Sequence, residues 1–447
     1  MPNLPPVWWP RRAAICALLV GLSGAGPVGS QTLPPPAPVA VVLDNGLRLL
    51  YESNPSSPVV AICAFVQVSA AQETFSSAGV RELLQLRGER TQVRLGQEPE
   101  GLPPILELRV SVSRDYVEAL ALCLPEGLEG ALRRLRAVLF EPYLDEAGLR
   151  FARERLGQEV AARQSVAISA AQDALVARLY PQWPGSWPLV GTGAAQWVDL
   201  DYLRRFHQQH YLANRTLLTV SGPLPLEAAQ GPVETVFGNL LPGGTGPRPS
   251  GPPVGAAAQP GWLTLTLVDS AVSVVAAGGR APTLTEEDYP AASVALVVLG
   301  QGRGSRLYRR LREERGLSYT IQAGLTPAAV CPYAYVLASC ASAQADQVRE
   351  ALEAELRSAS QQPPTEEEVQ RARQVACGQY LLQQQDSREL AHYLGLFALL
   401  GGEEGQQLWR TLPLRLAAVT PDQVQQVCQR MWGEPVGVVV AGGAASR

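Results

Sequence analysis

Residues 420–443, TPDQVQQVCQRMWGEPVGVVVAGG, align without gaps onto residues 199–222, DLDYLRRFHQQHYLANRTLLTVSG. In both segments an amphipathic stretch typical of a helix leads into an apolar run typical of a strand. A second pair of segments, RELLQLRGER at 81–90 and RLYRRLREER at 306–315, lies at a nearly equal offset. The chain is therefore expected to contain two copies of one α+β unit.

The segments between these repeats predict the elements of each copy. VAVVLDNGLRLLYES at 39–53 alternates around Asn45-Gly46, which is a strong signal for a β-hairpin. The apolar run PVVAICAFVQVS at 58–69 predicts a buried strand, and a helix is expected from Ser77 to Arg87. The stretch LPGGTGPRPSGPPVGAAAQPG at 241–261 is rich in Pro and Gly and lacks periodicity, as is typical of a linker.

These patterns predict an α+β fold with two homologous halves that resemble α/β sandwiches. Each half is expected to hold a mixed, largely antiparallel sheet with helices packed on it. The expected ranges are 31–240 for the N-terminal domain, 241–261 for the linker and 262–447 for the C-terminal domain. A chain of 447 residues is too long for a single core of ordinary size, which favours this division.

Residues 1–30 have the pattern of a secretory signal peptide. Arg11 and Arg12 precede an apolar run that begins at Ala13, and small residues lead up to Ser30, after which a cut is expected. The run is shorter than the ~20 residues that cross a membrane. We therefore expect export to the periplasm without stable membrane insertion. The alternative is anchoring by an uncleaved N-terminal segment.

The composition excludes several classes of function. A net charge of -4 and a pI near 5.7 give no long-range attraction for nucleic acid. All 37 basic residues are Arg, so no mechanism that uses a lysine is available. Six cysteines follow the predicted signal peptide, and their positions in apolar runs favour buried free thiols. Their even number leaves disulfides as an alternative.

Four stretches together resemble the pitrilysin/insulinase family of zinc peptidases, in particular its two-domain bacterial members and the subunits of mitochondrial processing peptidase. They are the hairpin LDNGLRLLYE at 43–52, the strand segment VVAICAFVQVSAAQE at 59–73, FHQQHYLANRTLLTVSG at 206–222, and LGQGRGSRLYRRLREERGLSYT at 299–320. They span most of the chain after residue 30, in the order that the family has. The resemblance implies the two-domain fold and a role in peptide hydrolysis.

Active members of this family carry His-x-x-Glu-His on the helix after the second strand, and a later Glu completes the zinc site. Here the two His positions are Glu82 and Leu86, and the position of the general base is Gln85. The distal Glu is matched by Glu159, which is otherwise most simply a surface residue. Leu86 has no donor atom and Gln85 cannot take a proton from water near neutral pH. The resemblance therefore implies a degenerate zinc site, with no metal bound by this chain.

The second half keeps the other part of the family's site. Active members use an Arg and a Tyr to hold the scissile carbonyl as charge develops on its oxygen, and Arg312 and Tyr319 match both in spacing and in context. The alternative is a structural role, with Arg312 on a salt-bridged surface helix and Tyr319 packed in a strand. Arg309 and Arg310 each have a Glu four residues later, which predicts such ion pairs within the helix.

The chain contains three histidines, at 207, 210 and 392. His207 and His210 form His-x-x-His on a predicted helix, which is a possible metal pair. Their counterparts in the repeat are Cys428 and Met431, which favours a structural role. His392 is isolated in the sequence and suggests no function.

The sequence therefore predicts a subunit that is not an enzyme on its own. We expect it to pair with a homologous, zinc-bearing peptidase subunit, to supply Arg312 and Tyr319 to that partner's active site, and to help bind unfolded peptides. Zinc is expected in the partner. A proteolytically inactive binding or scaffold protein of the same fold is the alternative, and an enzyme with other chemistry is disfavoured because no Ser/His/Asp or Cys/His set is visible.

Overall fold

The computed structural model describes residues 37–95, 105–181, 183, 193–244, 257–268, 270 and 272–443. The predicted signal peptide at 1–30 and residues 245–256 of the predicted linker lie outside this described part. The boundaries of the two predicted domains therefore stay predictions. In the described part, no helix is long and apolar enough to cross a membrane.

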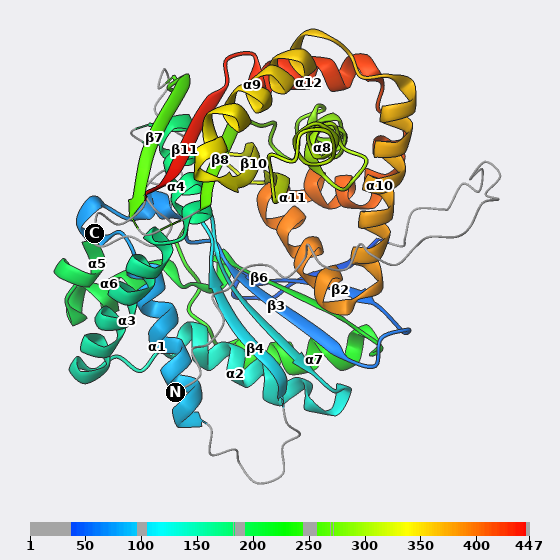
Figure 1. Ribbon diagram of the computed structural model, residues 1–447. Helices are drawn as coiled ribbons and strands as arrows, with labels where there is room; N and C mark the ends of the chain where they lie inside the picture. The colour runs from blue at the N-terminus through cyan, green and yellow to red at the C-terminus, as the bar shows by residue number, and fades with distance from the viewer. Residues whose placement is uncertain are drawn as a thin grey trace. The chain divides into compact units, whose positions relative to one another are not determined.

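Two sheets form the frame of the molecule (Figure 1). The first has the order β1-β2-β6-β3-β5-β4, and the second has the order β7-β11-β8-β10-β9. The strands are β1 Val39–Val42, β2 Arg48–Ser53, β3 Val60–Val66, β4 Ile105–Val112, β5 Val117–Cys123, β6 Thr216–Gly222, β7 Gly261–Val268, β8 Val272–Arg280, β9 Thr320–Thr326, β10 Tyr333–Ala341 and β11 Val436–Gly443.

The two sheets confirm the predicted repeat. In the first sheet β2 pairs with β6 in parallel, and in the second β7 pairs with β11 in parallel, while every other pairing of the described strands is antiparallel. The order β2-β6-β3-β5-β4 thus matches β7-β11-β8-β10-β9, and β1 is an addition to the first half. The predicted fold class, with two mixed and largely antiparallel sheets, is confirmed.

The helices account for most of the remaining described chain. They are α1 Val80–Leu95, α2 Leu128–Phe140, α3 Glu146–Gln164, α4 Ala167–Leu179, α5 Gly193–Trp197, α6 Leu200–His210, α7 Leu226–Phe237, α8 Tyr289–Gly300, the π-helix η7 Tyr308–Glu314, α9 Ala345–Gln361, α10 Glu366–Gln385, α11 Ser387–Ala417 and α12 Pro421–Trp432. The repeated segments fold as predicted, because α6 leads into β6 and α12 leads into β11.

The hairpin that opens the first sheet is confirmed around Asn45-Gly46. Strands β1 and β2 pair antiparallel, and Gly46 has a φ of 85°, which a residue with a side chain adopts only with strain. The side-chain nitrogen Nδ2 of Asn45 donates to the Phe237 carbonyl at 2.8 Å, and its side-chain oxygen accepts from the backbone amide of Leu47 at 3.2 Å. The turn is therefore fixed by local geometry and by a contact with the end of α7.

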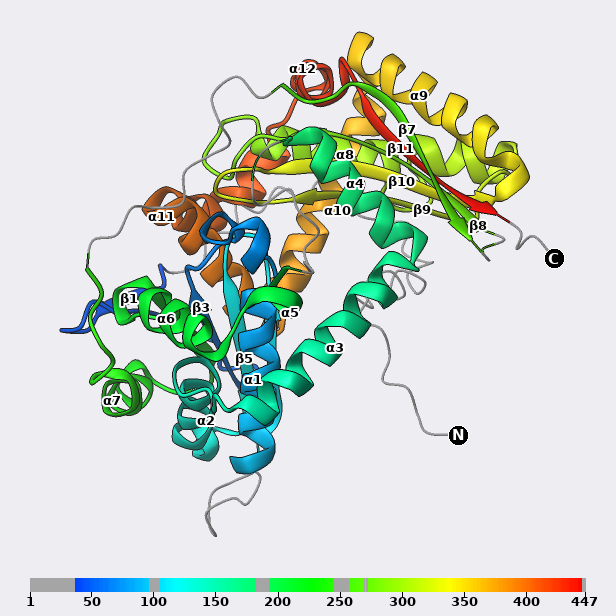
Figure 2. The same ribbon diagram turned by 90° about the vertical axis from the view of Figure 1, so that its left-hand side faces the viewer.

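The helices that cover the sheets are exchanged between the halves. Helix α4 belongs to the first half in sequence, yet it packs on β8 and β11 of the second sheet, where Leu175 joins a cluster with Val274 and Val438. Helix α11 of the second half packs on β3 and β6 of the first sheet. Figures 1 and 2 show both crossings from perpendicular directions. Neither half therefore has a core made of its own residues alone.

The packing of α11 on the first sheet depends on a small residue. A Cβ atom added to Gly395 would lie 2.1 Å from Cε2 of the Phe65 ring, which is closer than any real contact. The Thr219 hydroxyl on β6 donates to the Ala391 carbonyl of α11 at 2.7 Å. The absence of a side chain at Gly395 thus lets α11 lie close to the first sheet. The hydrogen bond from Thr219 helps to fix the position of the helix on the sheet.

The cysteines behave as the sequence predicted. All six cysteines of the described part are free, and five of them are buried, with Cys377 partly exposed. Burial raises the pKa of Cys428 and of Cys123 to about 12, so both are uncharged thiols at neutral pH.

Candidate functional site

The helix that carries the family's zinc motif begins immediately after a sharp turn. Gly79 has a φ of 97°, and its amide donates to the Glu73 carboxylate at 3.1 Å. The helix starts at Val80, preceded by a 3-10 turn at Phe75–Ser77, so the predicted start at Ser77 was three residues early. Val80 and Leu83 are completely buried, which places the residues of the motif against the first sheet and its covering helices.

The three motif positions cannot form a zinc site. Glu82 is 3% exposed, and neither carboxyl oxygen has a hydrogen-bond partner on another described residue. Burial, reinforced by the charge of Glu73, raises the pKa of Glu82 to about 8, so the group is mostly uncharged at pH 7. Gln85 donates to the Val110 carbonyl at 3.1 Å, and Leu86 is a buried hydrocarbon.

A permanent positive charge also lies beside this position. The Arg81 guanidinium is 1% exposed, contacts the Glu73 carboxylate at 2.7 Å, and donates to the Val68 and Ser113 carbonyls. An arginine stays charged at any ordinary pH, so it opposes the binding of a divalent cation nearby. The buried Arg81 guanidinium and the uncharged Glu82 carboxyl group therefore occupy the interior at the position of the family's zinc motif.

The distal position is brought near Glu82 but is not a ligand. Glu159 lies on α3, is 41% exposed and faces Arg155 at 3.7 Å, as expected for a surface residue. Its charge is one of the smaller causes that raise the pKa of Glu82, so the two groups are electrostatic neighbours. Within the described ranges no three His, Cys, Asp or Glu residues are placed to hold a metal ion. Zinc therefore does not fit the described residues at these positions.

The Arg/Tyr pair of the second half is assembled and faces solvent. Arg312 lies on the π-helix η7, and its Nη1 donates to the Tyr319 carbonyl at 2.5 Å. The guanidinium carbon lies 5.3 Å from the ring centroid of Tyr308. Tyr319 immediately precedes β9, where its amide donates to the Ser339 carbonyl at 2.9 Å and its side chain is 58% exposed. The structure thus brings the two predicted residues together through the backbone.

Buried anchors hold this pair in place. Leu311 is completely buried next to Arg312, and its carbonyl accepts the Leu317 amide at 2.7 Å. The Ser318 hydroxyl donates to the Ser339 carbonyl at 2.9 Å. These buried contacts therefore fix the loop between η7 and β9, while the Arg312 guanidinium and the Tyr319 phenol are exposed to solvent.

The predicted ion pairs within this helix are wrong. Arg310 instead contacts Glu355 of α9 at 2.5 Å, and Arg309 contacts Glu368 of α10 at 3.6 Å. Arg306 also binds Glu368, at 2.7 Å. The helix is a π-helix, whose wider turn changes how two side chains that are four positions apart lie relative to each other. The arginines form ion pairs with the acidic residues of α9 and α10 instead. In the part that the structure describes, Arg312 pairs with no carboxylate.

The three histidines divide into two kinds. His207 is half-buried and its Nε2 bonds the Leu139 carbonyl at 2.8 Å, while burial lowers the pKa of His210 to about 4. Both have the structural role that the sequence predicted. His392, by contrast, pairs with Glu118 at 2.7 Å across 274 residues of sequence, a contact that the sequence did not indicate.

Comparisons with known proteins agree with this picture. Residues 198–376 match the family described as Peptidase M16 inactive domain. An uncharacterized zinc protease of Mycobacterium leprae is 25% identical over 411 residues, which cover 91% of this chain and 92% of that protein. An uncharacterized zinc protease of Mycobacterium tuberculosis is 26% identical over 421 residues, covering 92% and 94%.

Solved structures share the fold. A protease from Helicobacter pylori superposes with a TM-score of 0.81 at 15% identity, covering 91% of this chain and 100% of that chain. A peptidase M16 inactive domain from Pseudomonas fluorescens gives a TM-score of 0.78 at 17% identity, covering 92% and 99%.

Fold and site together define a peptidase-type protein whose first half lacks the residues of a zinc site. The chain is similar to the M16-type peptidases, and the resemblance to the pitrilysin/insulinase family that its sequence indicated is confirmed. The match to the inactive domain is consistent with a non-catalytic homologue.

Proposed function

We propose that this protein is the non-catalytic subunit of an exported, heterodimeric zinc metalloendopeptidase. The observation that carries the proposal is the contrast between the two halves of the site. The zinc positions are closed by Glu82, Gln85 and Leu86, whereas Arg312 and Tyr319 are assembled and exposed. A homologous partner that binds zinc would supply what this chain lacks.

The chemistry of the pair suits this role. Arg312 keeps its positive charge and has no carboxylate partner among the described residues, so it is available to an oxygen on which negative charge develops. Tyr319 offers one O–H donor at the surface. Donors placed where charge appears in the transition state are worth roughly 10²–10³ in turnover, provided that water is excluded. Closure by a partner would exclude that water.

The position of the pair also suits an extended peptide. Tyr319 directly precedes β9, which lies at one edge of the second sheet in the described part of the chain. Peptides bind to sheet edges by adding a strand, with main-chain hydrogen bonds giving affinity. An unfolded substrate held along such an edge would bring its carbonyl groups past Arg312 and Tyr319.

The test is co-expression with a homologue from the same genome that encodes His-x-x-Glu-His. Arg312→Ala and Tyr319→Phe should each lower hydrolysis of an unfolded reporter peptide by about 100-fold, with co-elution of the two subunits unchanged. Arg315→Ala is the matched control, since Arg315 is exposed at the end of the same helix. Unchanged hydrolysis in Arg312→Ala would overturn the role of this residue.

Export and the inactive scaffold alternative are tested separately. A periplasmic fraction whose mature chain begins at Gln31 supports cleavage after Ser30. If the two subunits co-elute and zinc is found in neither, the complex is not a peptidase and the scaffold role stands in its place.

A further inference from the structure

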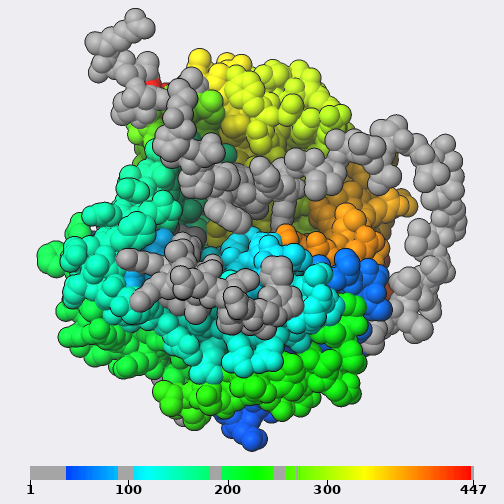
Figure 3. All heavy atoms as spheres, turned by 90° about the horizontal axis from the view of Figure 1, so that it is seen from below, coloured from blue at the N-terminus to red at the C-terminus, as the bar shows by residue number. Residues whose placement is uncertain are grey.

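A pocket of about 420 Å³ lies where the two halves meet, away from the Arg/Tyr pair. Its walls come from α8, α10 and α11 of the second half, the end of β9, and the turn between β4 and β5 of the first half. Figure 3 shows the cyan surface of the first half next to the orange surface of the second. A volume of several hundred Å³ is in the range of pockets that hold small organic molecules.

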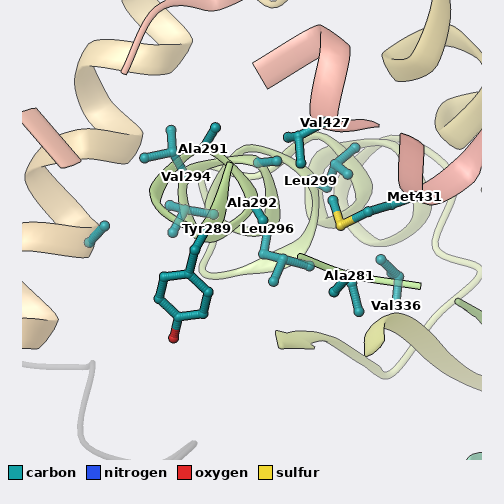
Figure 4. Packing of buried hydrophobic residues seen from close by; sticks show 14 of the residues in the cluster. Ala281, Tyr289, Ala291, Ala292, Val294, Leu296, Leu299, Val336, Val427 and Met431 are labelled. Atoms are coloured by element: carbon teal, nitrogen blue, oxygen red, sulfur yellow. The ribbon is translucent and has the colours of Figure 1, made fainter. Parts of the chain in front are cut away.

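Several aromatic rings belong to the wall of the pocket. Trp409 stacks on Tyr393, with centroids 5.7 Å apart and planes inclined by 9°, and Phe397 lies 5.1 Å from Trp409. Tyr289 continues the wall at 6.2 Å from Phe397. Figure 4 shows its ring projecting from α8 with the hydroxyl directed away from the packed cluster around that helix. Flat aromatic walls favour a flat aromatic guest.

One residue of the same wall has a hydrogen-bond donor without a partner. Trp409 is 1% exposed, and its indole nitrogen has no hydrogen-bond partner in the described structure. A buried donor left unpaired is destabilising, and a ligand with an acceptor atom would relieve that cost. His392 also lines the pocket, and its Nδ1 faces the Glu118 carboxylate at 2.7 Å, so Nε2 is the ring nitrogen left for other contacts.

No carboxylate or guanidinium group lines this pocket among the described residues. Although burial alone would raise the pKa of Glu118, the His392 imidazole lowers it, so the carboxylate stays ionised behind the histidine. The amides of Gln301, Gln379 and Gln383 line it together with serine, threonine and tyrosine hydroxyls. A cationic ligand would lose its hydration there without a carboxylate in the lining, and the ionised Glu118 behind His392 disfavours an anion.

We propose that this pocket binds a small, uncharged aromatic molecule that carries a hydrogen-bond acceptor. The aromatic wall contacts the planar part of the molecule, and the Trp409 indole donates to its acceptor. The proposal stands apart from the role of Arg312 and Tyr319, because it needs neither a partner subunit nor zinc. Since both halves line the pocket, a bound molecule would also resist their separation.

Coumarin is a suitable probe, because it is flat, neutral and carries a ring carbonyl, and naphthalene is its counterpart without an acceptor. Calorimetric titration of the mature chain should show one coumarin site per chain, bound about ten-fold more tightly than naphthalene. Ala376→Trp fills the pocket from α10 and should weaken coumarin binding at least ten-fold. Val375→Trp, at the neighbouring position that is 39% exposed and outside the pocket lining, should change it less than two-fold.

Cooperative thermal unfolding of each variant establishes that it is folded. If Ala376→Trp does not fold, Gln379→Trp on the exposed rim of the pocket takes its place, with the same expected loss of binding. The absence of coumarin binding at millimolar concentration overturns the proposal. Equal binding by the filled variant also overturns it, and equal affinity for naphthalene removes the role of the donor.

Discussion

Replacing Glu82 by Gln should change how the stability of this protein depends on pH. Glu82 is 3% exposed, and its two carboxyl oxygens lack hydrogen-bond partners on other described residues. Its pKa is raised from 4.5 to about 8, first because burial removes the charged form from water and then because Glu73 lies nearby. Gln has nearly the same shape as the protonated acid and does not titrate.

The sign and the size of the effect follow from proton linkage. Between pH 4.5 and 8 the folded chain holds a proton on Glu82 that the unfolded chain has released, so the free energy of unfolding falls as pH rises. With pKa values of about 8 when folded and 4.5 when unfolded, the loss between pH 5 and pH 7 is about 2.5 kcal/mol. The stabilisation is fully present below pH 4.5 and is gone above pH 8.

Urea denaturation at pH 5 and at pH 7 measures this loss. Other buried acids titrate in the same range, as Glu52 does with a pKa of about 7, but their contributions cancel in the difference between wild type and Glu82→Gln. Glu159→Gln, at the 41% exposed distal position, should change the pH dependence only slightly, because the charge of Glu159 is the smallest of the causes that raise the pKa of Glu82. If wild type and Glu82→Gln lose equal stability between the two pH values, Glu82 is charged in the folded protein and the reasoning fails.

Three further predictions concern packing, buried charge and thiols. Gly395→Ala should lower the free energy of unfolding by about 1–3 kcal/mol, because the added carbon overlaps Phe65, and a urea midpoint equal to wild type would contradict the close approach of α11. Arg306→Met should cost about 3 kcal/mol in the same assay, since it removes one of the arginines that face the fully buried Glu355 carboxylate. Among the six cysteines of the described part, a thiol reagent should modify at most Cys377 rapidly, and fast reaction of a second of these thiols would show that the buried cysteines are accessible.

Local sequence patterns were sufficient for the parts of the fold that depend on neighbouring residues. The Asn45-Gly46 hairpin and the completely buried strand β3 follow from turn chemistry and apolar runs. The degenerate zinc positions could also be read directly, because a leucine has no donor atom in any fold. The resemblance to the family likewise implied that Arg312 and Tyr319 act together, although it did not show that a side chain meets a backbone carbonyl.

Contacts between distant segments were not predictable in the same way. The acids that bind the arginines of η7 come from α9 and α10, and the sequence suggested acids within the helix itself. His392 had no visible partner, because Glu118 is 274 positions away. The raised pKa of Glu82 depends on burial by elements of the whole first half, which no pattern of charges along the chain reveals.

The sequence by itself determined the repeat, the identity of the strands and most helices, and the loss of the zinc ligands, because each of these rests on residue type and short-range spacing. Only the tertiary structure decided that α4 and α11 exchange sheets, that Glu82 is buried without a partner, and that aromatic residues of α8 and α11 enclose a pocket. The reason is physical: burial and pairing are properties of surfaces brought together by folding, and many arrangements of the same helices would satisfy the same local patterns.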